Sequence, residues 1–374
     1  MKQFIYADNA ATTKLEKTAL AAMLPWLSDE YGNASQPYSF ARAPKKALAA
    51  ARQVIATAIN AEPDEIYFTS GGTESDNWAI KGSAFSDADK RATITSSIEH
   101  HAILHACEAI ERLGYPVAYL SPNEKGVVSP ETLEAIITTK TRLVSVMFSN
   151  NEIGTIEPIQ ELAQVAHKYG AVFHTDAVQA VGHVSIDVQE LGVDMLSASA
   201  HKFNGPKGVG FLYIRKGIEI APFNDGGAQE SGQRAGTENI ASIVGMAEAL
   251  KTNYDHIVEN KRHLASLEQE LLNGISDLDF IRNGAESHVP GNISLSFKNA
   301  DGEAILHRLD LMGICISTGS ACDSNNTQIS HVIKAIRVPP EYAKGTIRIS
   351  LGKDNTKEDV DSIAACLTKI LRKV

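Results

Sequence analysis

The alternation of short β-rich runs with helical segments between residues 65 and 214 restricts the fold more than any other feature of the sequence. The strand-like runs are EIYFTSG (65–71), ATITSSI (92–98), RLVSVMFSN (142–150), AVFHTDAV (171–178), DMLSASA (194–200) and GVGFLYI (208–214). Such alternation predicts a layered α/β domain around a mostly parallel sheet. In sheets of this kind binding residues collect at the carboxyl ends of the strands, so functional residues are expected there.

The pattern changes after about residue 240. The sequence predicts a long amphipathic helical stretch from 239 to about 273, which would join the first domain to the next. Isolated strands follow at NISLSF (292–297) and TIRISLG (346–352), with helical segments between and after them. This arrangement predicts a second, smaller α+β domain.

Charge and cysteine usage exclude several classes of protein. The 374 residues carry a formal net charge of −10, which disfavours nucleic acid or an anionic membrane as a partner. No apolar run of about 18 residues occurs, and the first residues do not resemble a signal peptide. The four cysteines (107, 315, 322 and 366) lack the CxxC spacing of a zinc site, so we expect free thiols in a cytoplasmic protein.

Two polar positions follow predicted strands in the second half of the first domain. Lys202 stands in SASAHKFNGPKGVG (197–210), where a lysine can form a Schiff base with a carbonyl cofactor. A lone loop lysine is ordinarily just solvated. Asp176 in HTDAVQAVG (174–182) could hold the pyridinium nitrogen of pyridoxal phosphate (PLP) or cap the next helix, and Gln179 could reach the same place.

A glycine turn after the first strand predicts an anion site. In TSGGTESDNWAI (69–80) two glycines precede Thr73, which opens a helix. Backbone N–H groups at a helix start bind phosphate. A capping box between Thr73 and Asp76 is the structural alternative, and both can hold together.

Histidines follow the next strand in SSIEHHAIL (96–104). The imidazole of His100 could stack on a planar ring or move a proton. His101 and His105 have the i,i+4 spacing of a metal pair, but the HExxH glutamate is missing, so a helix surface is favoured. A lysine, an aspartate, a phosphate turn and a histidine, each after a strand, together indicate a PLP site.

With these residues assembled, the chain resembles the cysteine desulfurases of the NifS/IscS type, in the class-V aminotransferase group of fold-type I PLP enzymes. The resemblance covers nearly the whole length and rests on YADNAATT (6–13), YGNAS (31–35), FTSGGTESDN (68–77), EHHAIL (99–104), NNEIGTIEPI (150–159), HTDAVQAVG (174–182), SASAHKFNGPKGVG (197–210), GGAQESGQRAGTEN (226–239), STGSAC (317–322) and IRISLG (347–352). It implies an α/β fold with a large PLP-binding domain (16–250) around a mostly parallel seven-stranded sheet. Residues 1–15 and 251–374 would form a small α+β domain that carries the cysteine loop.

The resemblance also implies roles for individual residues. Lys202, Cys322 and His100 would be catalytic. The cofactor would be held by Gly72, Thr73, His100, Asn151, Asp176, Gln179, Ser199, His201, Lys202 and Thr237, of which Thr237 reaches the phosphate of the other subunit in a homodimer. The substrate would be bound by Asn151, Asn33 and Arg348, whose guanidinium suits a bidentate contact with a carboxylate.

The implied reaction takes sulfur from L-cysteine, gives L-alanine and leaves a persulfide on Cys322. An acceptor would then collect the sulfur for iron–sulfur clusters, thiolated tRNA or a sulfur-containing cofactor. No metal is expected, and Cys322 would meet an iron–sulfur cluster only transiently. Direct contact with nucleic acid or a membrane is not expected. Cys107, Cys315 and Cys366 lie in helical or apolar contexts, where core packing is favoured.

Two positions depart from the usual pattern of the family. Tyr38 stands where a histidine is common, and Asp323 follows Cys322 where threonine or serine is common. A neighbouring carboxylate should raise the pKa of the Cys322 thiol. Three alternatives stay open from the sequence: a selenocysteine lyase, another class-V aminotransferase, and a catalytically silent scaffold subunit.

Overall fold

The central sheet has seven strands, and all but one of them run parallel to each other. The computed structural model describes residues 4–87, 89–318 and 329–372. The strands lie in the order β2 (Ile66–Thr69), β8 (Gly210–Ile214), β7 (Met195–Ser199), β6 (Val172–Asp176), β5 (Thr141–Ser145), β3 (Ala92–Ser96) and β4 (Val117–Leu120). Only β8 is antiparallel to its neighbours. The predicted mostly parallel α/β sheet is confirmed, and β4 is the one strand in it that the sequence analysis did not predict.

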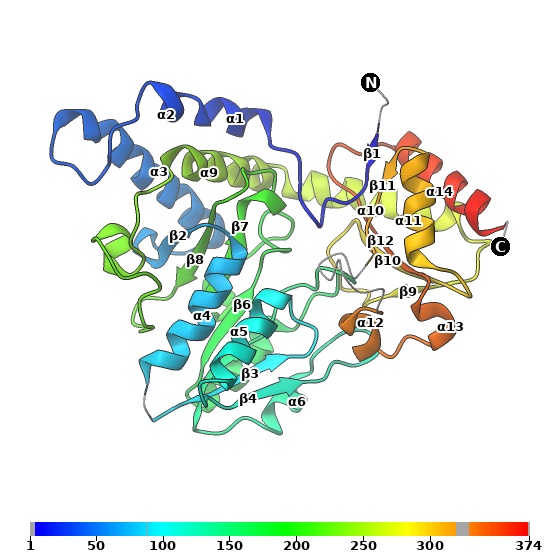
Figure 1. Cartoon of the computed structure of the whole chain (residues 1–374), viewed down its shortest axis with the longest axis horizontal. Helices are drawn as coiled ribbons and strands as arrows, with labels where there is room; N and C mark the ends of the chain where they lie inside the picture. Colours follow the sequence, from blue (N-terminus) through cyan, green and yellow to red (C-terminus); the bar gives the residue numbers. More distant parts are fainter. Residues whose placement is uncertain (1–3, 88, 319–328, 373–374) are drawn as a thin grey trace.

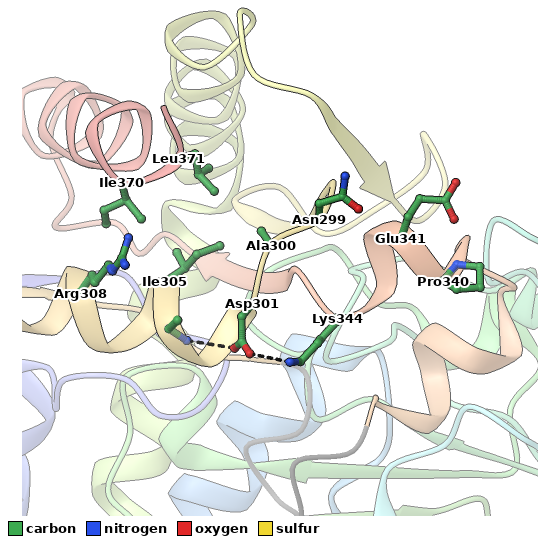
Figure 2. Close-up of a pocket in the computed structure, with 11 residues that line it drawn as sticks. Asn299, Ala300, Asp301, Ile305, Arg308, Pro340, Glu341, Lys344, Ile370 and Leu371 are labelled. Atoms are coloured by element: carbon green, nitrogen blue, oxygen red, sulfur yellow. Dashed lines mark hydrogen bonds and ion pairs between the residues drawn. The ribbon is translucent and has the colours of Figure 1, made fainter. Parts of the chain in front are cut away.

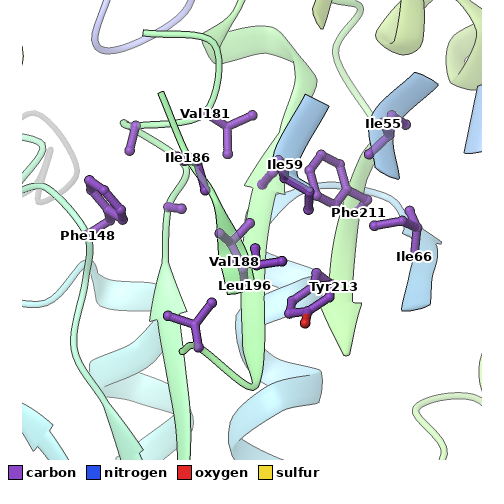
Figure 3. Close-up of a cluster of buried hydrophobic side chains, with 14 of the residues drawn as sticks. Ile55, Ile59, Ile66, Phe148, Val181, Ile186, Val188, Leu196, Phe211 and Tyr213 are labelled. Atoms are coloured by element: carbon purple, nitrogen blue, oxygen red, sulfur yellow. The ribbon is translucent and has the colours of Figure 1, made fainter. Parts of the chain in front are cut away.

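Helices cover both faces of this sheet (Figure 1). Side chains alternate between the faces along each strand, because successive residues of a strand point to opposite sides. In β6, Phe173 packs into one core and Val172 into the other. Figure 3 shows part of the first core, where Ile55 and Ile59 meet Phe211.

Each core is closed by its own set of helices. The first core is closed by α3 (Arg42–Ile59), α7 (Ile159–Lys168), α8 (Val188–Leu191) and α9 (Ile240–Asp255), and the second by α4 (Gly72–Ser86) and α5 (His101–Glu111). Shorter helices α1 (Lys17–Met23), α2 (Pro25–Ser28) and α6 (Pro130–Glu134) complete this part of the chain.

The C-terminal part is smaller and has its own core. Its antiparallel sheet has the order β12 (Thr346–Ser350), β10 (Asn292–Phe297) and β9 (Phe280–Asn283). Packed around it are α10 (Ile257–Gly274), α11 (Gly302–Leu311), α13 (Pro340–Ala343) and α14 (Lys357–Leu371). The short helix α12 (His331–Ala335) packs instead in a separate cluster with Ile98 and Ile153. The N-terminal strand β1 (Ile5–Tyr6) pairs with β11 (Ile314–Cys315), so the start of the chain joins this part. The domain limits at residues 16 and 250 stay a prediction.

The predicted single helical stretch from 239 to about 273 is wrong in one respect, because the structure has two helices there. α9 ends at Asp255 and α10 begins at Ile257. In a continuous helix the backbone N–H of His256 would donate to the carbonyl of Thr252. Instead the His256 side chain lies 2.9 Å from that carbonyl through Nδ1, and its backbone N–H turns to Asn253. The side chain thus replaces the helical hydrogen bond and interrupts the helix.

None of the helices within the described residues is long and apolar enough to cross a membrane.

Candidate functional site

A cavity of about 360 Å³ opens at the carboxyl ends of the parallel strands. It is lined by Ala10, Ala11, Gly72, Thr73, Asp76, His100, Met147, Asn151, Asp176, Val178, Gln179, Ser199, His201, Lys202 and Arg348. Most of the residues singled out from the sequence are therefore gathered around one space. They come from six stretches of chain, each of which carries one of the motifs or directly adjoins it.

A second cavity of about 520 Å³ lies in the C-terminal part, away from these residues (Figure 2). Its lining comes from α11, α13, the end of α14 and the segment before α11, and an Asp301–Lys344 ion pair crosses its edge. None of the candidate residues lines it, so the first cavity is the candidate active site.

Lys202 reaches the cavity from the turn that follows β7. Its Nζ donates to the backbone carbonyls of Ala10 (2.7 Å) and Ala11 (2.8 Å). The N-terminal segment is fixed in this place by further hydrogen bonds, among them one from the Thr13 hydroxyl to the carbonyl of His201. These two backbone acceptors hold the amine at the cavity.

His100 lies after β3 and caps the start of α5. Its Nδ1 accepts from the backbone N–H of Ala102 at 3.1 Å, so the ring proton lies on Nε2. Burial, followed by the positive charge of Lys202, lowers the pKa of His100 to about 4. A neutral, flat imidazole therefore faces the cavity at neutral pH.

Asp176 is the last residue of β6 and is buried. Its Oδ1 accepts from the backbone N–H of Val178 at 2.9 Å, which is the capping role that the sequence allowed. Burial raises the pKa of Asp176 to about 6, against the hydrogen bond from Val178 and the charge of Lys202. A protonated ring nitrogen in the cavity would give this buried carboxylate a further positive neighbour besides Lys202. Gln179 is on the same wall, where its amide donates to Ala10.

The start of α4 forms one end of the cavity. Its N-cap is Gly71, and no side chain caps the helix, so the predicted capping box between Thr73 and Asp76 is not formed. A Cβ on Gly72 would lie 2.6 Å from the Val178 side chain, so only glycine fits there. The backbone N–H of Gly71 donates to the Thr69 hydroxyl, so the N–H groups of Gly72 and Thr73, which line the cavity, are the ones placed to receive an anion.

Two further side chains stand beside this turn. Ser199 ends β7 and lines the same end of the cavity, next to His201. The His201 Nδ1 lies 3.1 Å from the Thr12 hydroxyl, and burial lowers the pKa of His201 to about 4. A hydroxyl, an imidazole and free backbone donors thus converge at one point.

Arg348 closes the opposite wall from β12 of the C-terminal part. Its Nη2 donates to Asp8 at 2.8 Å, and its Nη1 donates to the backbone carbonyl of Asn151 at 2.9 Å. Backbone hydrogen bonds in both directions also join Arg348 to Ser317, which lies two residues before the segment 319–328. Asp8, Ala10 and Ala11 were not among the predicted site residues, although YADNAATT was noticed as a family motif.

Some predicted residues lie elsewhere. Thr237 is exposed and Asn33 sits in the loop after α2; neither lines the cavity of its own chain, and their roles stay predictions. Cys322 and Asp323 lie outside the described residues. Tyr38 is exposed and lines no part of the cavity. Among the described cysteines, Cys107 is buried, while Cys315 and Cys366 are partly buried.

The histidine pair is not a metal site in the part of the chain that the structure describes. His101 packs against the rings of both His105 and His331, with centroids 5.1 and 5.0 Å apart. No group of three histidine, cysteine, aspartate or glutamate residues in residues 4–87, 89–318 and 329–372 is placed to hold a metal ion.

Comparison with known proteins agrees with this geometry. The family model for class-V aminotransferases matches residues 5–363. The chain belongs to the class-V aminotransferase family. It is 47% identical to a protein named cysteine desulfurase IscS from Methanosarcina thermophila, over 99% of this chain and 92% of that one. It is 48% identical to the protein of the same name from Dictyoglomus turgidum, over 100% of this chain and 96% of that one.

Solved structures give the same result. A NifS-like protein superimposes with a TM-score of 0.94 at 37% identity and covers all of both chains. A structure described as SspA in complex with cysteine superimposes with a TM-score of 0.84 at 36% identity, over 94% of this chain and all of that one. The resemblance to the NifS/IscS-type cysteine desulfurases and the α/β fold of that group are confirmed.

Proposed function

We propose that this protein is a PLP-dependent cysteine desulfurase that converts L-cysteine into L-alanine and an enzyme-bound persulfide. The observation that carries the proposal is the convergence of Lys202, Asp176 and His100 with Arg348 on one cavity. The first three suit a pyridoxal ring, and the guanidinium suits the carboxylate of an amino acid.

The cavity residues fit PLP on three grounds. The Gly71–Gly72 turn leaves backbone donors at a helix start, where a phosphate binds. Asp176 is a buried carboxyl on the cavity wall, and a protonated ring nitrogen would stabilise its ionised form. The uncharged imidazole of His100 offers a flat face for the ring. PLP bound there would act as an electron sink that makes the substrate α-proton and the Cβ–S bond labile.

The chain's own residues would divide the remaining work. Lys202 would carry the cofactor and, once displaced by the substrate amine, remove the α-proton. The neighbouring Ala10 and Ala11 carbonyls keep its Nζ within the cavity. Gln179, Ser199, His201 and Thr73 would orient the cofactor from the large-sheet side. Arg348 and Asn151 would orient the substrate from the other side.

Cys322 would receive the sulfur. Its thiolate would attack the substrate sulfur, so that an S–S bond forms as the Cβ–S bond breaks and its electron pair passes to the cofactor-bound carbon skeleton. The described residues on either side of segment 319–328 are near the cavity wall: Ser317 pairs with Arg348, and His331 Nε2 lies 3.1 Å from the carbonyl of Glu99. A protein acceptor, such as an iron–sulfur scaffold or a tRNA-thiolation enzyme, would then take the persulfide sulfur.

A homodimer with shared sites accounts for the exposed loop that carries Thr237. Arg234 in this loop pairs with Glu74 of the phosphate turn, with 2.7 Å between Nε and Oε1. Glu230, at the loop's other end, pairs with Arg52. The loop is thus fixed to its own subunit. Thr237 is exposed and does not line the cavity of its own chain, as a contribution to a partner's phosphate site would require.

The N-terminal region offers an apolar surface for such a partner. Its large exposed apolar side chains are Leu20, Leu24, Leu27, Tyr31, Tyr38 and Phe40. Exposed apolar side chains that recur through one region suit a contact between subunits.

The proposal is tested by incubating the purified protein with L-cysteine and measuring alanine, protein persulfide and visible absorption. We expect equal amounts of alanine and transferred sulfur, and we expect Cys322→Ser to keep the yellow cofactor but lose the persulfide. Cys315→Ser is the matched control and should still form the persulfide. A colourless protein would reject PLP binding, a keto-acid product without sulfide would indicate an aminotransferase, and faster turnover of selenocysteine would indicate a lyase. A persulfide that survives in Cys322→Ser would reject the assignment of the thiol.

A further inference from the structure

The turn that carries Lys202 is held in place by hydrogen bonds from other parts of the chain. It follows β7 and begins with a short 3-10 helix, Ala200–Lys202. Within the turn, the backbone N–H groups of Phe203 and Gly205 donate to the carbonyl of Ala200. The next four carbonyls, those of residues 201–204, each accept a hydrogen bond from outside the turn. The backbone around Lys202 is therefore fixed residue by residue, and not by a regular helix or sheet.

The N-terminal segment holds the two ends of this run of carbonyls. Thr13 donates to the carbonyl of His201 from its backbone N–H and from its hydroxyl, both at 2.8 Å. The backbone N–H of Glu16 donates to the carbonyl of Asn204 at 2.8 Å. The two carbonyls in the middle, which include that of Lys202 itself, depend on side chains.

These two side chains are His183 and Asn253. Nε2 of His183 lies 2.9 Å from the carbonyl of Lys202, and Nδ2 of Asn253 donates to the carbonyl of Phe203 at 2.8 Å. Because a carbonyl oxygen can only accept, the proton of the imidazole lies on Nε2. Burial lowers the pKa of His183, against the effect of its hydrogen bond to Lys202, so the ring is neutral at pH 7. His183 thus offers one N–H, and the Lys202 carbonyl receives it.

His183 is delivered by the stretch that also carries Asp176. The backbone N–H of His183 donates to Ala180, and Gly182 has a φ of +80°. A Cβ on Gly182 would lie 2.6 Å from the Cβ of Phe203, so this turn lies directly against the lysine turn. His183 therefore ties the segment of Asp176 to the backbone of Lys202.

We propose that His183 is a positioning residue for Lys202, which fixes the backbone from which the amine reaches the cavity. His183 does not line the cavity, so it acts only through Lys202. The amine has to condense with the aldehyde of PLP, with loss of water, and a reacting group that is already in place loses less freedom when the bond forms. The inference rests on the proposed binding of PLP to Lys202, but not on the reaction with L-cysteine.

The test compares His183→Gln with His183→Leu in the full chain, from which the cofactor is removed and titrated back. Glutamine carries its amide nitrogen the same number of bonds from Cα as Nε2 of histidine, so it keeps the donor, whereas leucine fills similar space without one. We expect the dissociation constant of PLP to rise about tenfold in His183→Leu and to stay within about threefold of the wild type in His183→Gln. Unchanged PLP affinity in His183→Leu, or an equal loss in both variants, would overturn the inference.

A second ligand separates positioning of the amine from a general effect on the cavity. Pyridoxine 5′-phosphate has the ring and the phosphate of PLP but no aldehyde, so it binds without a bond to Lys202. We expect His183→Leu to bind it as the wild type does. If the affinity for pyridoxine 5′-phosphate falls as much as that for PLP, His183 shapes the cavity and does not act through the amine.

His263→Leu is the matched control. Nε2 of His263 also lies 2.9 Å from a backbone carbonyl, that of Asn355, and neither residue lines the cavity. This variant should bind PLP with wild-type affinity, and a loss equal to that of His183→Leu would contradict a specific role of His183. If His183→Leu does not fold by circular dichroism, His183→Asn takes its place, because its shorter amide ends before the carbonyl.

The outcome is separable from that of the proposed function, since both ligands are titrated without L-cysteine. A protein that binds PLP but forms no alanine or persulfide would refute the desulfurase and leave the result for His183 standing. Wild-type PLP affinity in His183→Leu would overturn this inference and leave the desulfurase standing.

Discussion

The two sides of the cavity are built in different ways. On the large-sheet side, Asp176 ends one strand of the sheet, and Thr73 and Lys202 stand in the turns that follow two others. On the other side, Ala10 and Arg348 come from opposite ends of the chain. They are brought together by contacts such as the Arg348–Asp8 ion pair, between residues 340 positions apart in the sequence.

This difference separates two tasks. The parallel register of a sheet with a packed core on each face fixes the large-sheet side before anything binds, which suits a cofactor that stays in place. The other side depends on a few hydrogen bonds among β12, the N-terminal segment and the Asn151 turn. Changes there should alter substrate binding and leave the cofactor in place.

The largest effect is expected on the sheet side, from Lys202→Ala. Without the amine, PLP cannot form its Schiff base and the α-proton loses its base, so we expect the protein-bound visible absorption to disappear. Turnover of L-cysteine should fall by at least about 10³-fold, within the range of general acid–base contributions. Lys207→Ala, a change of an exposed lysine in the same loop, is the control, and its visible absorption and turnover should match those of the wild type. A yellow, active Lys202→Ala variant would contradict the assignment.

On the other side of the cavity, Arg348→Gln should weaken the binding of the substrate and leave the binding of the cofactor unchanged. Removing one member of a buried charge pair costs about 2–5 kcal/mol, so KM for L-cysteine should rise by about 100-fold. The visible absorption should match the wild type. Arg308→Gln, in the separate cavity of Figure 2, is the matched control. Loss of PLP from Arg348→Gln would show that the two sides are not separable.

A smaller rise in KM for L-cysteine is expected from Asp8→Asn. Asp8 orients the guanidinium at 2.8 Å but does not line the cavity, so the variant should raise KM by about tenfold with little change in kcat. Inhibition by cysteamine, which lacks a carboxylate, should change less than twofold. An equal loss for cysteamine would mean that Asp8 shapes the cavity rather than the carboxylate contact.

The contrast between the two sides of the cavity also explains which site residues could be predicted from the sequence. The strands that precede Asp176 and Lys202 have strong apolar patterns, and a polar residue directly after such a strand is easily noticed. The edge strand β4 is short and half-buried, so its pattern is weak. Asp8 gave no local signal, because its partner Arg348 is far away in the chain.

Local signals also misled where a side chain replaced a backbone contact. At His256 the helical pattern continues unbroken, and only the hydrogen bond of the imidazole to Thr252 divides the helix. Thr73 and Asp76 have the spacing of a capping box, but Asp76 is buried and lines the cavity instead. Periodicity describes which face of a segment is apolar, and it cannot say which partner a polar side chain selects.

The smallest expected effect concerns the buried carboxyl group of Glu99 on the large-sheet side. It is seen in how the free energy of unfolding depends on pH. Burial raises the pKa of Glu99 from its ordinary value to about 8, so the folded protein keeps a proton that the unfolded chain loses near pH 4.5. The stabilisation that follows is complete below pH 4.5 and is lost as the pH rises through about 8. Burial lowers the pKa of His174 to about 3, which acts in the opposite direction but only below about pH 6.5.

The window from pH 6.5 to 8.5 therefore isolates the carboxyls. In Glu99→Gln the amide can still accept from the Ser96 hydroxyl and the Met147 N–H, which now bind Oε1 of Glu99 at 2.5 and 2.9 Å. Across this window, urea denaturation of the wild type should show a free energy of unfolding that falls by up to about 2 kcal/mol more than that of Glu99→Gln. Glu108→Gln, an exposed change on α5, should keep the wild-type slope. Parallel slopes for Glu99→Gln and the wild type would mean that Glu99 is ionised in the folded protein, and the sheet side would then have to hold a second negative charge beside Asp176.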